Sequence, residues 1–138
     1  MKNIVLISCV SKKLDRKSTA ENIYTSSFFR KNLTYAKSLK PSGIFILSAK
    51  HGLLKLTDEI EPYDKTLNKM RVNERKEWSK VVVNQLKSVV DLKKDQFTFL
   101  AGNKYREYLL TELDQVKIPM QGLKIGEQLQ WLTKQNSK

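Results

Sequence analysis

The chain has 138 residues, the size of one domain with a single hydrophobic core. Hydrophobic residues make up 40% of it and charged residues 29%, which excludes disorder of the whole chain, and no apolar run reaches the roughly 20 residues that span a bilayer. Twenty-six lysines and arginines against fourteen acidic residues give a net charge of +12. This charge favours a protein that binds a nucleic acid or a phosphorylated ligand over the alternative, a protein whose positive charge is spread evenly over its surface without such a partner.

Apolar, β-branched segments alternate along the chain with segments of helical period. The predicted strands are residues 4–9, 44–48, 97–101 and 116–119. The predicted helices cover about residues 26–39 and 73–90, and two more begin near residues 103 and 126. This order predicts an α/β fold: one domain over residues 1–138, built as a three-layer sandwich of a four-stranded, mostly parallel sheet with helices on both faces. The longest irregular stretch is residues 49–72, and its length indicates a functional loop.

Polar residues follow each predicted strand, at the edge of the sheet where α/β proteins bind ligands. After the first strand these are Ser8, Cys9, Ser11, Lys12 and Lys13; after the second, Ser48, Lys50, His51 and Gly52; after the third, Gly102, Asn103 and Tyr105. Small, hydroxylic and basic residues at helix starts favour a phosphate. Neither a P-loop nor a dinucleotide-binding glycine motif is present.

The start of the first predicted helix adds three candidates. One of Thr25, Ser26 and Ser27 is expected to cap the helix. Tyr24 is expected either to stack on a base or to pack on the core. Arg30 lies in the first turns, from which it is expected to reach a phosphate.

His51 is the only histidine, and it is expected to act as a general acid or base, to donate to a developing negative charge, or to cap a turn. Lys50 beside it would lower its pKa. The alternatives for the acidic cluster of residues 58–64 are to hold a divalent ion, to provide a general base, or to neutralise the nearby arginines; a structural role is favoured for Asp58 and Glu59. Glu61 and Asp64 flank a Pro-Tyr pair, and one of these two carboxylates is expected to be functional. Tyr63 of that pair is a further candidate for substrate binding.

Cys9 is either a nucleophile or, as we prefer, a buried thiol at the end of a strand. As the only cysteine it excludes an internal disulfide and suits a reducing cytoplasm, where we expect the protein to act. One histidine and one cysteine cannot supply the usual zinc ligands, so no zinc site is expected. Among the alternatives for the acidic cluster we favour those without a metal, and we predict no cofactor.

Several blocks together resemble the YaaA-like superfamily. They are residues 6–15, 47–53, 60–64 and 99–105, and small bacterial and phage domains of that superfamily also share residues 24–29 and 122–132. The resemblance implies DNA binding. It also implies a distant similarity to uracil-DNA-glycosylase-like folds, in which loops after the strands of a four-stranded parallel sheet recognise a base that must be flipped out of a duplex.

These observations lead to three alternative functions. The first is a glycosylase-type enzyme that acts on an N-glycosidic bond, with Lys12, Lys13 and Arg30 on phosphate, His51 stabilising charge, and Glu61 or Asp64 orienting water. The second is a non-catalytic DNA-binding module, such as a stress or phage factor. The third is a hydrolase or transferase of free nucleotides. The partner is expected to be DNA rather than RNA, or a phosphorylated nucleotide, and not a membrane. If the protein is an enzyme, we expect one pocket to be surrounded by Lys12, Lys50, His51 and Glu61.

Overall fold

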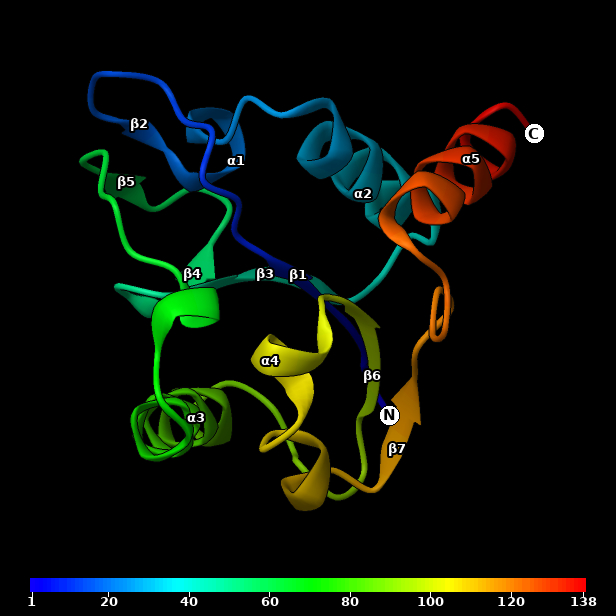
Figure 1. Ribbon diagram of the computed structural model, residues 1–138. Coiled ribbons are helices and arrows are strands. Elements are labelled where there is room, and N and C mark those ends of the chain that lie inside the picture. Colours follow the sequence, from blue (N-terminus) through cyan, green and yellow to red (C-terminus); the bar gives the residue numbers. More distant parts are fainter.

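A five-stranded sheet forms the centre of the protein in a computed structural model that describes residues 1–138 (Figure 1). In spatial order its strands are β4 (Gly52–Lys55), β3 (Gly43–Ser48), β1 (Asn3–Ser8), β6 (Gln96–Leu100) and β7 (Gln115–Lys117). β1 pairs in parallel with β3 and β6, and β6 pairs in parallel with β7. Because β1 is flanked on both sides and covered on both faces, its residues 4–7 are all almost completely buried.

Helices lie on both faces of this sheet (Figure 1). On one face are α2 (Ser27–Ser38) and α5 (Ile125–Asn136), which pack against each other; on the other are α3 (Val72–Lys87) and the short α4 (Asn103–Arg106). The remaining elements are α1 (Ala20–Ile23), β2 (Ser18–Thr19), β5 (Glu59–Ile60), and the 3₁₀ helices η1 (Leu67–Lys69) and η2 (Leu110–Glu112). The Ser26 hydroxyl accepts a hydrogen bond from the Phe29 amide at 3.1 Å, so Ser26 is the cap of α2. No helix combines the length and the apolar composition that crossing a bilayer requires.

The predicted α/β class is confirmed, but the prediction of four mostly parallel strands is wrong. The sheet has five strands and is mixed, because β4 turns back directly from β3 and pairs with it antiparallel, with Leu47 opposite Leu53 and Ile46 opposite Leu54. Residues 49–72 are therefore not one irregular stretch, since they contain β4, β5 and η1. The two leucines between polar neighbours are too short a signal to predict a strand.

The helix predicted from residue 103 is also wrong in extent. It ends at Arg106, and η2 follows after a turn. The apolar residues spaced four apart in this segment nevertheless lie in the core, since Tyr105, Leu109 and Leu113 are all buried. The first residue of α5, Ile125, is apolar but 58% exposed.

A second, two-stranded sheet joins the loop after β1 to the segment after β4. In it β2 pairs antiparallel with β5, and nearby the Ala20 amide donates to the Asp58 carbonyl at 2.7 Å. This pairing, extended by the bond from the Glu21 amide to the Leu56 carbonyl at 3.0 Å, holds residues 18–21 beside residues 56–60, although the two segments are far apart in sequence. Both segments reach the carboxyl end of the sheet as a result.

Replacing Gly52 by Ala is expected to destabilise the fold. Gly52 begins β4 with φ of +75°, and a Cβ there would lie 2.3 Å from Oε1 of Gln85. That amide group holds the turn, since it accepts from the Leu53 amide at 2.8 Å and donates to the His51 carbonyl at 3.2 Å. We expect the free energy of unfolding to fall by about 2 kcal/mol or more in urea titration.

The matched control is Gly126→Ala, because Gly126 lies inside α5 and nothing is within 4 Å of its added Cβ. Its stability should stay the same or rise by up to about 1 kcal/mol, as Ala is the better helix former. Equal stability of Gly52→Ala and wild type would contradict the role given to this turn.

Candidate functional site

The chain reverses direction across the sheet at β1, so a crevice is expected where the loops after β1 and β6 part. The chain leaves β1 for β3 through α2 on one face, whereas it leaves β6 for β7 through α4 on the other face. A cleft of about 830 Å³ lies at this point. Residues 8–11 at the end of β1, residues 100–105 at the end of β6, and residues 64–66, 68 and 69 line it, together with Lys13, Phe28, Ile125 and Gln128.

The cleft is strongly positive. Four lysines line it, and the only acidic side chain among its lining residues is Asp64; the lysines are Lys13, Lys65, Lys69 and Lys104. Hydroxyl and amide groups of Ser8, Ser11, Thr66 and Asn68 supply further polar contacts. Such a lining suits a ligand that carries negative charge and several hydrogen-bonding atoms.

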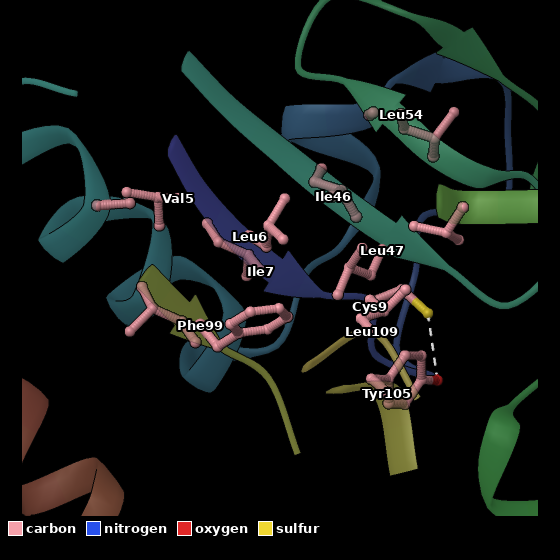
Figure 2. Packing of buried hydrophobic residues seen from close by; sticks show 14 of the residues in the cluster. Val5, Leu6, Ile7, Cys9, Ile46, Leu47, Leu54, Phe99, Tyr105 and Leu109 are labelled. Atoms are coloured by element: carbon pink, nitrogen blue, oxygen red, sulfur yellow. Dashed lines mark hydrogen bonds between the residues drawn. The ribbon is translucent and has the colours of Figure 1, made fainter. Parts of the chain in front are cut away.

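The floor of the cleft is formed where Cys9 meets Tyr105 (Figure 2). The Cys9 thiol points from the end of β1 toward the Tyr105 hydroxyl of α4, with Sγ and the oxygen 3.4 Å apart. That hydroxyl also accepts from the Leu67 amide at 3.5 Å. Burial, followed by the nearby Cys9, raises the pKa of Tyr105 above its usual range, so the phenol stays protonated at neutral pH.

Lys13 stands over two tyrosine rings at the side of the cleft. Its Nζ is 4.3 Å from the centre of the Tyr63 ring and 5.6 Å from that of Tyr24. Burial lowers the pKa of Lys13, while Cys9 and then Asp64 act in the opposite direction. The ammonium group is thus held in a fixed place and binds its proton less tightly than an ordinary lysine does.

A chain of buried hydroxyls lies behind Lys13. The Tyr24 and Tyr63 hydroxyls are 2.7 Å apart, Ser48 Oγ donates to the Tyr63 oxygen at 2.8 Å, and the His51 amide donates to Ser48 Oγ at 3.1 Å. Tyr24 and Ser48 are completely buried, and burial raises the pKa of both tyrosines. Trp78 is buried next to this layer, and its indole donates to the Ser48 carbonyl at 2.9 Å.

About half of the predicted site residues meet in the cleft. They are Ser8, Cys9, Ser11, Lys13, Asp64, Gly102, Asn103 and Tyr105. Tyr24, Ser48 and Tyr63 lie behind it as the hydroxyl chain, so the prediction that Tyr24 stacks on a base is replaced by its alternative, packing on the core.

The other predicted residues are placed elsewhere. Ser26 caps α2, Gly52 forms the turn into β4, and the Arg30 guanidinium donates to the Glu21 carbonyl instead of facing the cleft. Lys12 and Glu61 are exposed outside the cleft. Lys50 and His51 line another hollow, of about 550 Å³, which lies against α3 and shares only Lys65 with the cleft. The predicted cluster of Lys12, Lys50, His51 and Glu61 around one pocket is therefore not formed, because the β3–β4 turn directs residues 50–51 toward α3.

His51 packs edge-on against the Tyr63 ring, with ring centres 5.5 Å apart, and its buried Nε2 has no hydrogen-bond partner. Burial, and then the charge of Lys50, lowers its pKa from 6.5, while Asp58 opposes the shift. Since the unfolded chain binds this proton more readily, acid unfolding should begin as pH falls through about 6.5. We expect thermal melts between pH 8 and pH 5 to show a loss of stability that His51→Gln reduces; identical profiles would contradict this placement.

The cleft also contains residues that the sequence did not single out. Lys65, Thr66, Asn68 and Lys69 follow Asp64 directly, and Phe28, Ile125 and Gln128 come from the starts of α2 and α5. The run from Asp64 to Lys69 was a usable signal, because it is polar and basic within a stretch expected to be functional. Ile125 and Phe28 gave no signal, since an apolar residue at helical spacing is normally read as core.

Comparison with known proteins gives one match. The model of the family described as "Family of unknown function (DUF6884)" matches residues 4–134, which is nearly the whole chain and includes every part of the cleft. No curated protein and no solved structure matches the chain significantly.

Proposed function

The chain belongs to the family of unknown function DUF6884, and from its cleft we propose that it binds a nucleotide unit and hydrolyses the N-glycosidic bond of that unit. The observation that carries the proposal is the concentration of four lysines and a single carboxylate around a cleft at the reversal point of the sheet. The volume of about 830 Å³ is ample for a nucleotide, given that ligand pockets hold roughly 300–1,000 Å³.

The two sides of the cleft match the two ends of a nucleotide. Lys65, Lys69 and Lys104 supply positive charge for a phosphate, and Lys104 is positioned by its bond to the Asn68 carbonyl at 3.4 Å. Phe28 and the exposed Ile125 form an apolar wall, which suits the face of a base. A small phosphorylated metabolite would leave this wall unused.

In the proposed reaction a water molecule attacks C1′ of the sugar. The water oxygen forms a bond to C1′, the bond from C1′ to the base nitrogen breaks, and its electron pair leaves with the base. Asp64 takes the proton of the water, and the Lys13 ammonium supplies a proton to the departing base. The lowered pKa of Lys13 favours that donation, and the negative charge of Asp64 stabilises the positive charge that develops on the sugar.

This assignment gives His51 and Glu61 no contact with the reacting atoms, since neither lines the cleft. It also gives Cys9 no part in the reaction, since Cys9 is a buried residue of the floor in contact with Tyr105, in line with the preferred expectation of a buried thiol. The proposal covers both a free nucleotide and a nucleotide that is part of a strand.

Isothermal titration with the four deoxynucleoside monophosphates tests the binding step. Replacing both Lys69 and Lys104 by Ala should weaken binding by at least about tenfold, because each removes a charge-assisted contact. The matched control replaces Lys55 and Lys117 by Ala, two exposed lysines outside the cleft, and should bind as wild type does. Absence of binding to wild type, or equal loss in both variants, would overturn the proposal.

A further inference from the structure

A second basic groove lies on the outer side of α3, apart from the cleft. Its volume is about 410 Å³, and it runs between α3 and the segment that follows α4. Lys76, Lys80 and Lys87 line it from α3, and Tyr108 and Glu112 form the opposite wall. None of these residues lines the cleft.

The three lysines share one face of the helix. They stand four and eleven positions apart, which returns nearly to the same direction at 3.6 residues per turn. At about 1.5 Å per residue the row extends for roughly 16 Å, longer than a single phosphate requires and suited to a chain of phosphates.

The charges of this groove are mostly free. Lys80 pairs with Glu77 at 3.2 Å, but Lys76 and Lys87 make no ion pair. Lys76 instead stands over the Tyr108 ring, with Nζ 5.5 Å from its centre, which holds a positive charge at the groove without neutralising it. Glu112 is the only acidic residue in the lining, so the groove keeps an excess of two positive charges.

The far wall of the groove is joined to the cleft through a short, fixed segment. Asn103, Lys104 and Tyr105 line the cleft, and Tyr108 and Glu112 of the same segment line the groove. The ion pair between Arg75 Nε and Glu107 Oε1, at 3.2 Å, ties this segment to α3 between the two sites. A chain lying in the groove would therefore pass along the same wall that borders the cleft.

We propose that the α3 groove binds the phosphate backbone of a single DNA strand, one nucleotide of which enters the cleft. The choice of a nucleic acid rests on the proposed function of the cleft. A single strand fits best because its bases are already unpaired, so that a nucleotide reaches the cleft without the cost of opening a duplex.

The test measures fluorescence anisotropy of a short labelled single-stranded DNA across a range of salt concentrations. Replacing Lys76, Lys80 and Lys87 by Glu should weaken binding at least tenfold. It should also lower the slope of log K against log salt by about 2, as expected when three contacts to a single strand are lost. Lys80→Glu places a second carboxylate beside Glu77, and the repulsion between the two can disturb α3. The variant with Gln at all three positions is therefore measured in parallel, and it should show a smaller loss of DNA affinity and a smaller change of the salt slope.

The matched control replaces Lys55, Lys117 and Lys134 by Glu, which gives the same net charge at exposed positions outside both sites. Equal weakening in the groove and control variants, or wild-type binding by the groove variant, would overturn the inference. Titration of mononucleotides separates the two proposals, since groove variants should keep mononucleotide binding. If wild type bound the strand through the groove but bound no mononucleotide, the groove would stand and the proposed function of the cleft would fail.

Discussion

Asp64→Asn should abolish most of the release of free base from a nucleotide substrate while leaving substrate binding largely intact. Asp64 is the only carboxylate that lines the cleft, and the amide of Asn cannot take a proton from the attacking water. Loss of a general base reduces rates by about 10²–10⁴-fold. Chromatographic detection of free base over time, with deoxynucleoside monophosphates and single-stranded DNA as substrates, gives the rate.

Glu61→Gln is the matched control for this experiment. Glu61 and Asp64 lie three residues apart and are both exposed, yet only Asp64 lines the cleft. The Glu61 variant should therefore retain the wild-type rate. A larger loss in Glu61→Gln than in Asp64→Asn would show that the wrong carboxylate had been assigned.

Tyr24→Ala should cost about 3–5 kcal/mol of unfolding free energy, the range for removing a large buried aromatic side chain. Tyr24 is completely buried, its ring centre lies 4.9 Å from that of Phe29, and its hydroxyl is hydrogen-bonded to the hydroxyl of Tyr63. Such a loss is a large part of the 5–15 kcal/mol typical of a whole domain. Urea titration followed by circular dichroism measures it.

Tyr24→Phe separates the ring from the hydroxyl. It keeps the packing against Phe29 but leaves the Tyr63 hydroxyl with one partner fewer, so we expect a cost of about 1–2 kcal/mol. Nucleotide affinity should stay unchanged in Tyr24→Phe, because the side chain does not line the cleft. A selective loss of affinity with unchanged stability would instead support the stacking role that the sequence suggested for Tyr24.

Much of the fold could be predicted because its signals are local. The parallel strands β1, β3 and β6 are short apolar runs, and α2, α3 and α5 carry apolar stripes at helical spacing. β7 overlaps the strand predicted at residues 116–119, although it contains only one apolar residue, Val116. β4 could not be predicted, because it is stabilised by its pairing with β3 and by the hydrogen bonds of Gln85 to its turn. Neither interaction can be recognised from a few neighbouring residues of the sequence. Tertiary pairing also decides the position of β2 and β5.

The site was predictable only where it follows a central strand. Residues after β1 and β6 meet in the cleft because both strands end at the reversal point of the sheet. His51 follows β3 in the same way, but the antiparallel return of β4 turns it toward α3. Ile125 stands four and seven residues before Leu129 and Leu132, which is the spacing of a core residue, yet it is exposed at the cleft. Such local exceptions are expected at binding sites.

The central claim, that the cleft binds a nucleotide, is tested most directly by NMR. Backbone amide shifts of the labelled protein would be followed during titration with a deoxynucleoside monophosphate. The predicted result is a saturable set of shifts confined to residues 8–13, 64–69 and 100–105, with Phe28, Ile125 and Gln128. Shifts centred on residues 50–52 in the hollow against α3, or no saturable shifts at all, would contradict it.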